Sequence, residues 1–310
     1  MRKLFLIALL WLPWSTRAQT DLNSQWIAFN RASGPDSNLQ CFRPKNVSVS
    51  SGNLIITTKS ELAACSSFDL SFAVYHYTSG FVSMRNFNFL YGTVEFRAKF
   101  GGGVNTGAWP VVWMADASCQ ASDPTGTDYS CNEQEIDIAE ILHSDFTHVN
   151  QQIHVAKFSH NDGCNAYATD VSKNFHIYQL LWSAGSLVFK IDGATTCTIN
   201  QNYVPNAPMY LKIDAFVGKF GGPVNNGSLP WTTLLDYVKV TQGSSVIFED
   251  DFNPKDTNQP PNPTLATPSS IGLKIFWRWP LWGLVISLVI VFALIAFSFR
   301  GARSNRGKGS

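Results

Sequence analysis

The chain has 310 residues, of which 15% are charged and 45% hydrophobic, and its formal net charge is +1. Proteins that bind nucleic acid carry an excess of Lys and Arg on the binding surface. This chain has 23 Lys and Arg against 22 Asp and Glu, so we expect no nucleic-acid partner. A long apolar run lies near each end of the chain, which predicts segments of different kinds around one central domain.

Residues 1–18 have the layout of a secretory signal peptide. Arg2 and Lys3 precede the apolar run LFLIALLWLPW, and small or polar residues follow as far as Ala18. A buried N-terminal helix is the weaker interpretation, because the segment has no capping residue and no polar face. We therefore expect export and cleavage after Ala18.

The other end of the chain predicts a membrane anchor. Residues 254–275 are rich in Pro, Thr, Ser and Asn, which is typical of an extended linker. Residues 276–299 contain the uncharged run WPLWGLVISLVIVFALIAFSF. Its roughly 21 residues would form a helix about 31 Å long, enough to cross a bilayer. The basic tail, 300–310, predicts a cytoplasmic C-terminus, so the expected protein is single-pass, with its domain in the periplasm or at the cell exterior.

The central segment, 19–253, contains all six cysteines, as expected for an exported domain with disulfides. We take pairing between sequence neighbours as the working hypothesis. It joins Cys41 to Cys65, Cys119 to Cys131, and Cys164 to Cys197. The pairing of Cys119 with Cys131 has the most support, because it closes a loop rich in Gly, Ser, Thr and Asp. Asn46 and Asn226 each begin an N-glycosylation sequon.

The central segment is predicted to be all-β. Residues 91–99, YGTVEFRAK, alternate between apolar and polar side chains, and Asp192-Gly193 is a hairpin signal between two short strands. Whether Ala194 lengthens that hairpin loop is left open. Further strands are expected at 54–58, 178–182, 187–191, 195–199, 209–216 and 236–241. Many strands without intervening helices favour an antiparallel β-sandwich.

The six-residue segment EIDIAE (135–140) contains three carboxylates. In a strand, Glu135 and Asp137 share one face, but Glu140 has the wrong parity to join them. A helix would not bring the three together either. A β-bulge near Ala139 would return Glu140 to the acidic face, and bulges are common beside active sites. A solvated strand face is the alternative, but neighbouring isoleucines in place of Lys or Arg argue against it.

Crowded carboxylates repel one another, so that one can stay protonated near neutral pH. Glycosidases need this property, because one carboxylate attacks the anomeric carbon while a second, protonated one donates to the leaving oxygen. The composition of EIDIAE therefore favours carbohydrate chemistry.

The EIDIAE segment resembles the catalytic signature of glycoside hydrolase family 16 in its bulged form, E-x-D-x-x-E, as found in laminarinases and licheninases. Four further segments resemble that family and occur in its order: YTSGFVSMRNFNFLYGTVEFRAKF (77–100), GAWPVVWMAD (107–116), FHIYQLLWSAGSLVFKIDG (175–193) and TTLLDYVKV (232–240). The resemblance implies a jelly-roll β-sandwich of two curved antiparallel sheets, to which the C-terminal transmembrane helix is added. It places the substrate cleft on the concave side.

By this resemblance, Glu135 is the catalytic nucleophile and Glu140 the general acid/base. Asp137 lies between them and positions the pair. The chemistry that the resemblance implies uses no metal or redox cofactor. Some relatives carry a structural calcium ion, to which no residue of this chain can be assigned.

Three further residues are candidates for substrate binding. Trp109 and Trp113 lie four residues apart in a predicted strand, hence on one face, where they could stack against pyranose rings. By the resemblance, His154 occupies the place of a histidine near the acid/base.

The expected activity is that of a retaining endo-β-glycan hydrolase, with β-1,3- or mixed β-1,3/1,4-glucan as the substrate. Two alternatives are open: a cell-wall glucan transglycosylase, in which a sugar hydroxyl replaces water, and a non-catalytic glycan-binding surface module. Glu135→Gln separates enzyme from binder, because a binder keeps its affinity whereas an enzyme loses turnover.

Overall fold

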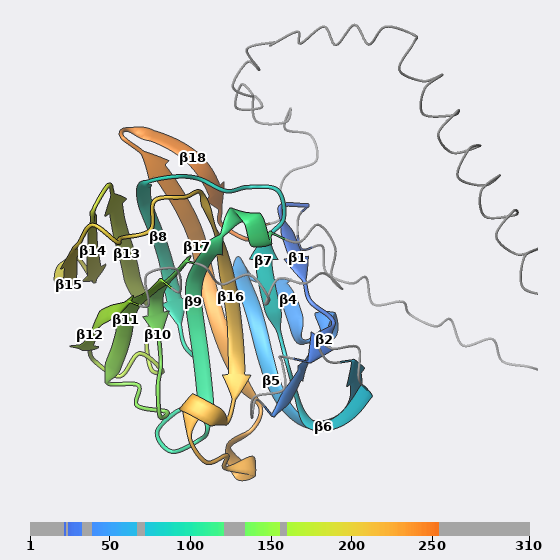
Figure 1. The fold of residues 1–310 in the computed structure, drawn as a ribbon. Helices are drawn as coiled ribbons and strands as arrows, with labels where there is room; N and C mark the ends of the chain where they lie inside the picture. The colour runs from blue at the N-terminus through green and yellow to red at the C-terminus, as the bar shows by residue number, and fades with distance from the viewer. Residues whose placement is uncertain are drawn as a thin grey trace, which may run out of the picture. The chain divides into compact units, whose positions relative to one another are not determined.

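The computed structural model describes residues 22, 24–32, 39–66, 72–120, 134–155 and 160–253 (Figure 1). The chain divides into two units, Met1–Gln259 and Pro260–Ser310, and only the first contains described residues. The expected signal peptide, linker, transmembrane helix and tail all lie outside them. Within the described ranges, no helix is long and apolar enough to span a bilayer.

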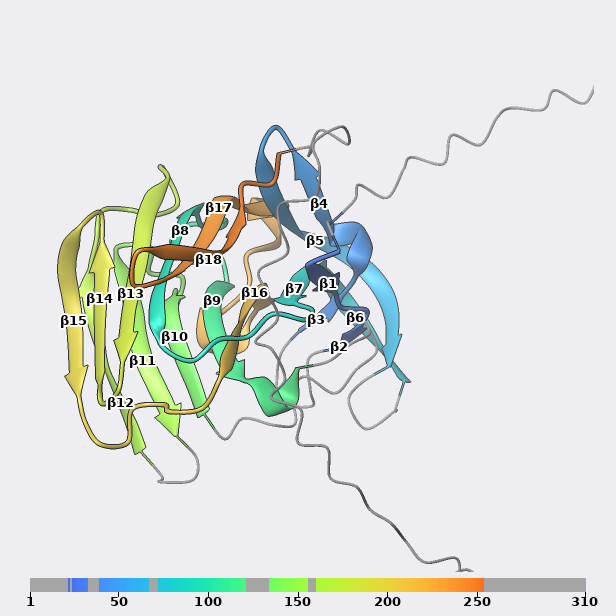
Figure 2. The same cartoon turned by 90° about the horizontal axis from the view of Figure 1, so that it is seen from above.

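The described strands form two sheets that lie face to face, as Figures 1 and 2 show. The first sheet has seven strands, in the order β1 (Trp26–Ala28), β7 (Phe81–Met84), β16 (Met209–Val217), β9 (Ala108–Asp116), β10 (Gln134–Glu140), β11 (His148–Val155) and β12 (His160–Tyr167).

The second sheet has eleven strands. Its main order is β15 (Ala194–Asn200), β14 (Ser186–Ile191), β13 (His176–Ser183), β8 (Gly92–Lys99), β17 (Trp231–Gln242), β5 (Asn53–Ser66), β6 (Phe72–Ser79), β3 (Gln40–Phe42) and β2 (Arg31–Ala32). Strand β18 (Ser245–Asp250) pairs with β17, and β4 (Val47–Ser50) pairs with β5. Among the described pairs, only β3–β6 is parallel, so the predicted antiparallel β-sandwich is confirmed.

The alternation predicted for 91–99 is present in β8. Val94, Phe96 and Ala98 are buried, whereas the residues between them are half-buried. The hairpin between β14 and β15 has a two-residue loop, because Ala194 already belongs to β15. Asp192 and Gly193 have φ values of 49° and 82°, as the primed turns of tight hairpins require.

The core between the sheets is built from such alternating side chains. In β10, Ile136 and Ile138 are fully buried, and Ile136 pairs with Met114 of β9 and Ile153 of β11, both also fully buried. Burial of each aliphatic side chain of this kind contributes about 1.5–3 kcal/mol. The opposite face of the same strands carries the polar residues of the candidate site.

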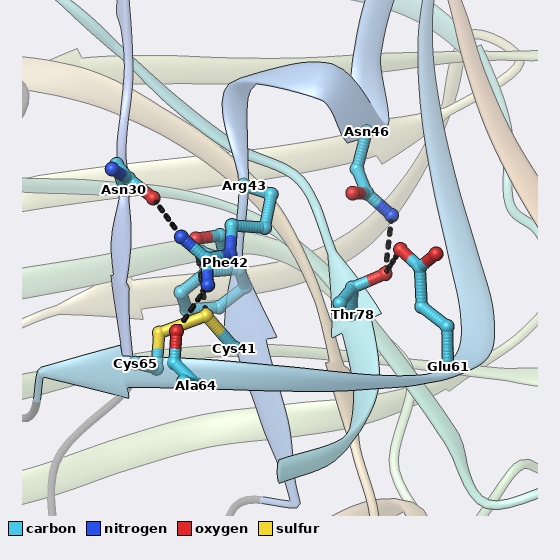
Figure 3. Close-up of a disulfide and its surroundings, with 9 residues drawn as sticks. All are labelled: Asn30, Cys41, Phe42, Arg43, Asn46, Glu61, Ala64, Cys65 and Thr78. Carbon is cyan, nitrogen blue, oxygen red and sulfur yellow. Dashed lines mark hydrogen bonds between the residues drawn. A yellow bond between two sulfur atoms is a disulfide. The ribbon is translucent and has the colours of Figure 1, made fainter. Parts of the chain in front are cut away.

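Two of the three expected disulfides are present. Cys41–Cys65 joins β3 to β5 (Figure 3), and Cys164–Cys197 joins β12 to β15, which are edge strands of the two different sheets. The third expected bridge involves Cys131, which lies outside the described residues.

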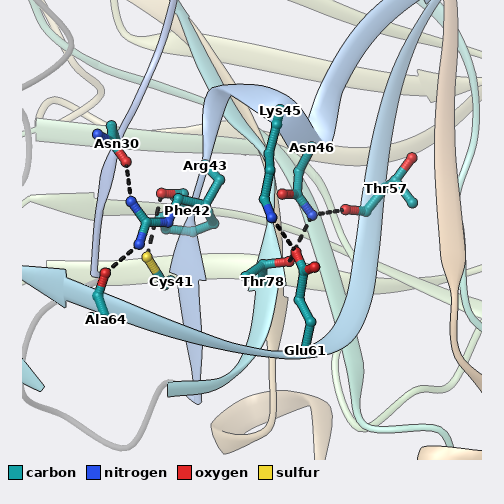
Figure 4. Close-up of polar contacts among 10 residues, drawn as sticks. All are labelled: Asn30, Cys41, Phe42, Arg43, Lys45, Asn46, Thr57, Glu61, Ala64 and Thr78. Carbon is teal, nitrogen blue, oxygen red and sulfur yellow. Dashed lines mark hydrogen bonds and ion pairs between the residues drawn. The ribbon is translucent and has the colours of Figure 1, made fainter. Parts of the chain in front are cut away.

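Polar contacts hold the segment around the Cys41–Cys65 bridge in place (Figure 4). The guanidinium of Arg43 donates to Asn30 Oδ1 at 2.8 Å and also to the carbonyl oxygen of Ala64. Asn46, in the 3-10 turn η1 (Pro44–Asn46), is buried, and its Nδ2 donates to Thr57 O at 2.7 Å and Thr78 Oγ1 at 2.9 Å. These bonds tie η1 across β5 and β6.

Residues 39–42, beside the Cys41–Cys65 bridge, form an anchored N-terminal segment that also covers one end of strand β16. Leu39 N donates to Val217 O at 3.1 Å, and Val217 N donates to Gln40 Oε1 at 2.9 Å. Phe42 packs edge-on against Phe216, with ring centroids 5.5 Å apart. The N-terminal segment therefore supports a strand that borders the candidate site.

Candidate active site

A β-bulge brings the three acidic residues of β10 to one face of the sheet. Across the pairing with β9, Asp137 lies opposite Trp113 but Ala139 lies opposite Val112, so β10 contains one extra residue at this point. The pairing with β11 shifts in the same interval. The extra residue turns the side chain of Glu140 to the opposite face of β10. Glu140 therefore lies on the same face as Glu135 and Asp137. The expected bulge is confirmed at this position.

Glu140 is held by three hydrogen-bond donors. Trp109 Nε1 donates to Oε1 at 2.8 Å, while Asn150 Nδ2 and Gln152 Nε2 each donate to Oε2 at 2.9 Å. The side chain is buried, and this burial, with a smaller contribution from the charge of Asp137, raises the pKa of Glu140. The donors oppose the shift without cancelling it, because they stabilise the charged form.

His154 lies directly across the strand pairing from Glu135. Its Nε2 is 3.3 Å from Asp137 Oδ2 and 3.9 Å from Glu135 Oε1. Its Nδ1 donates to Asn161 Oδ1 at 2.8 Å. Both ring nitrogens therefore face acceptors, and the hydrogen bond to Asp137 is the main reason that the pKa of His154 is raised. The described contacts place this cation at the Glu135 end of the cluster, whereas the resemblance placed it near Glu140.

Glu135 is the third member of the cluster, and 17% of its side chain is exposed. Burial first, and the neighbouring charge of Asp137 second, raise the pKa of Glu135 above its ordinary range. The positive charges of His154 and Lys212 act in the opposite direction. Carboxyl groups that share a site cannot all ionise freely, so protons are retained in this cluster at pH values where an isolated glutamate would be charged.

The two tryptophans expected to stack against sugar rings are both buried. Trp109 is 8% exposed and stacks on Phe216, with ring centroids 4.3 Å apart. Trp113 is 5% exposed, and its Nε1 donates to Asp214 Oδ2 at 2.9 Å. Both indoles support carboxylates of the site, and neither presents an open ring face. Sugar stacking by Trp109 and Trp113 stays a prediction.

Sequence reasoning missed four polar residues that complete the site: Asn150, Gln152, Lys212 and Asp214. A signal for them was present in the sequence. The segment HVNQQIHV places polar residues at every second position, on the face that also bears His154. In the strand MYLKIDAFV, two charged residues share one face of an otherwise apolar run. Paired charges at such a spacing mark a polar strand face.

Oxygen and nitrogen atoms of Glu135, Asp137 and His154 lie within 4.8 Å of one another, close enough to hold a metal ion. A metal would require a neutral imidazole nitrogen, however, and the bond to Asp137 raises the pKa of His154, which keeps the ring protonated. A metal ion and a proton would therefore compete for the same nitrogen of His154.

The chain is similar to several known proteins. Keratan-sulfate endo-1,4-beta-galactosidase of Sphingobacterium multivorum is 28% identical over 178 residues, which cover 54% of this chain and 40% of that protein. Endo-1,3-1,4-beta-glycanase EglC of Rhizobium meliloti is 28% identical over 196 residues, which cover 62% of this chain and 38% of that protein. This chain thus spans less than half the length of these curated relatives.

A solved structure matches more completely. A LamA variant of Z. galactanivorans in complex with laminaritriose and laminaritetraose superposes with a TM-score of 0.58 and 26% identity, covering 70% of this chain and 92% of that one. In addition, residues 37–238 match the family model described as glycosyl hydrolases family 16. Because that match spans more than half of the sequence, the chain belongs to family 16 of the glycosyl hydrolases.

Proposed function

We propose that the chain is a retaining endo-β-glycan hydrolase that cleaves β-1,3- or mixed β-1,3/1,4-glucan. The observation that carries the proposal is the bulge in β10, which gathers Glu135, Asp137 and Glu140 on one face between an imidazole and a set of amide and indole donors. The name of EglC supports a β-glycan with 1,3 and 1,4 linkages, and the laminari-oligosaccharide ligands of LamA support a glucan.

In the first step, the ionised carboxylate of Glu135 attacks the anomeric carbon and forms a glycosyl ester. The bond to the leaving oxygen breaks, and Glu140 gives that oxygen its proton. Burial raises the pKa of both Glu135 and Glu140, so the pair retains a proton, and the mechanism assigns that proton to Glu140. His154 favours the ionised form of Glu135, since its imidazolium lies 3.9 Å away. Asp137 holds this imidazolium in place from 3.3 Å.

The hydrogen bonds of Glu140 identify the oxygen that carries the proton. Each carboxylate oxygen offers two lone pairs. Oε2 uses both for Asn150 and Gln152, whereas Oε1 uses only one, for Trp109. The catalytic proton is therefore assigned to Oε1. In the second step the same oxygen accepts a proton from water, which attacks the anomeric carbon and releases Glu135.

The location of the protein is part of the proposal. Residues 276–299 would anchor the chain in a membrane, with the catalytic domain in the periplasm or at the cell exterior and the tail in the cytoplasm, on the strength of the sequence pattern. Protease added outside intact cells should release the domain and spare the tail. Resistance of the whole chain would contradict this topology.

The activity is tested with the full chain, Glu135→Gln, Glu140→Gln and the control Glu249→Gln, which changes an exposed glutamate of β18. Each is incubated with a panel of β-glucans and β-galactans, and the products are analysed by mass. Galactans belong in the panel because one relative is named as a β-galactosidase of keratan sulfate.

The proposal predicts shorter oligosaccharides from the parent chain and from the control, on β-glucan, and none from the two site variants. If longer products appear when an acceptor sugar is added, the chain is a transglycosylase and not a hydrolase. If a glycan binds all four proteins equally and none is cut, the chain is a glycan-binding module and the proposal is wrong.

A further inference from the structure

Two charged residues of β16 are fully buried beside the acidic cluster. Lys212 and Asp214 each have 0% exposure and lie two residues apart, hence on one face of the strand. In the sheet order β16–β9–β10, Lys212 pairs with Trp113, and Trp113 pairs with Asp137. The side chains of Lys212, Trp113 and Asp137 therefore form a row across three neighbouring strands.

Trp113 is held on two sides by these charges. Lys212 Nζ lies 4.0 Å from the centroid of the indole ring, a close cation–π contact. At the edge of the ring, Nε1 donates to Asp214 Oδ2 at 2.9 Å. The cation fixes the ring face and the carboxylate fixes the ring edge, so the indole has little freedom to tilt toward or away from Asp137.

A lysine with no solvent exposure is costly to keep in a fold unless nearby negative charge compensates it. The acids of this site provide such charge. The positive charge of Lys212 in turn acts to lower the pKa of Glu135 and of Asp214. An apolar residue at position 212 would fill the space without this cost. The buried charge therefore has a use other than packing.

We propose that Lys212 is a positioning residue for the catalytic carboxylates: it holds Trp113 in place and supplies the positive charge that favours ionised Glu135. The inference rests on the proposed function in treating Glu135 as the nucleophile. Its central quantity, the ionisation of Glu135, can nevertheless be measured without any substrate.

The charges that face Glu135 come from three strands. Asp137 and Glu140 on β10 oppose its ionisation, whereas His154 on β11 and Lys212 on β16 favour it. Asp214 on β16 is the remaining acid, and burial raises the pKa of Asp214 well above its ordinary range. Trp113 on β9 carries no charge. Loss of Lys212 removes one of the positive charges that favour ionised Glu135, so the pKa of Glu135 rises.

The test compares Lys212→Met, Lys212→Arg and the control Lys190→Met, a lysine of β14 in the other sheet. Lys212→Met keeps the length of the side chain and removes the charge. It should still fold, because Asp214 readily takes up a proton and is not left as an unpaired charge. Far-UV circular dichroism and thermal unfolding check this directly.

The first readout is a titration of 13C-labelled glutamate carboxyls by NMR in the full chain, with the Glu135 signal assigned by its absence in Glu135→Gln. Lys212→Met should move the Glu135 midpoint upward by on the order of one pH unit. Lys212→Arg should restore most of the shift, and Lys190→Met should leave the midpoint unchanged. The acidic limb of kcat/KM should move in parallel.

An unchanged Glu135 midpoint in folded Lys212→Met would overturn the inference, as would an equal shift in Lys190→Met. Failure of the proposed function is a separate result. It would appear as a parent chain that cuts no glycan, while the titration would still show whether Lys212 controls the ionisation of Glu135.

Discussion

Trp109 donates its indole N–H to Oε1 of Glu140 at 2.8 Å. The same indole stacks on Phe216 at 4.3 Å, and Phe216 in turn contacts Phe42 of the anchored N-terminal segment. Glu140 is thus connected through two aromatic contacts to the segment fastened by the Cys41–Cys65 disulfide. The orientation of a single carboxylate depends on residues from well-separated parts of the chain.

Trp109→Phe should reduce turnover while keeping the ring stack. Phenylalanine can still pack on Phe216, but it cannot donate to Oε1, the oxygen assigned to the catalytic proton. A hydrogen bond to a charged group contributes about 1.5–3 kcal/mol, so kcat should fall about 10- to 100-fold. Steady-state kinetics on the glucan that the parent chain cleaves measures the effect.

Trp26→Phe is the matched control for this substitution. Trp26 Nε1 donates to Asp250 Oδ2, also at 2.8 Å and also buried, but on strand β1 at the far edge of the sheet. It should lower the thermal unfolding temperature and leave kcat near that of the parent chain. Equal losses of kcat in both variants would mean that Trp109 acts only through stability.

Glu135→Gln should stabilise the fold in a pH-dependent manner. The pKa of Glu135 is raised above its ordinary value of 4.5, so the folded state binds this proton more tightly than the unfolded state. Stability from this group is therefore complete below about pH 4.5 and is lost as the pH rises toward the folded pKa. Glu135→Gln removes this loss of stability at high pH. The free energy of unfolding should therefore rise by on the order of 1–3 kcal/mol at pH 7.5 and change little at pH 4.

Thermal and urea unfolding at pH 4 and pH 7.5 measure this difference, with Glu249→Gln as the exposed control. A variant that is less stable than the parent at pH 7.5, and more stable at pH 4, would reverse the predicted sign and show that Glu135 is not strained by its surroundings.

Removal of the Cys164–Cys197 bridge should destabilise the edge of the sandwich. The bridge joins β12 to β15 and closes a loop with a sequence separation of 33. In the loop-entropy model, such a bridge contributes about 3–4 kcal/mol. The double substitution Cys164→Ser and Cys197→Ser should lower the free energy of unfolding by this amount in urea titrations. An unchanged unfolding midpoint would show that the sheets need no covalent link here.

The two sequons should behave differently in a host that attaches N-glycans. Asn46 is 2% exposed and uses Nδ2, the glycan acceptor atom, for hydrogen bonds to Thr57 and Thr78, whereas Asn226 is exposed. Folded protein should carry no glycan at Asn46, and peptide mass spectrometry would show this. A glycan at Asn46 in folded protein would contradict the described packing around η1.

The local features of the fold were predictable from local patterns. The alternation of β8 and the Asp192-Gly193 turn depend on neighbouring residues and appear as expected. Strand β17 begins at Trp231, earlier than predicted, because its first half pairs with β5, more than a hundred residues away in the sequence. No local pattern contains that information.

The same division applies to the candidate site. Parity alone required a bulge before Glu140, because one residue had to be added for the three acids to share a face. The burial of Trp109 and Trp113 could not be predicted, since Phe216, which stacks on Trp109, and Asp214, which accepts from Trp113, come from β16, about a hundred residues later. For the same reason, the partnership of Lys212 with Trp113 was not visible before the fold was known.

The central claim is that Glu135 is the nucleophile, and covalent trapping tests it most directly. The full chain is incubated with an activated 2-deoxy-2-fluoro glucoside, digested with protease and analysed by peptide mass spectrometry. We predict one glycosyl adduct on Glu135 in the parent chain and in Glu140→Gln, because the activated leaving group needs no acid, and none in Glu135→Gln. An adduct on another residue, or glucan cleavage by Glu135→Gln at the parent rate, would contradict the claim.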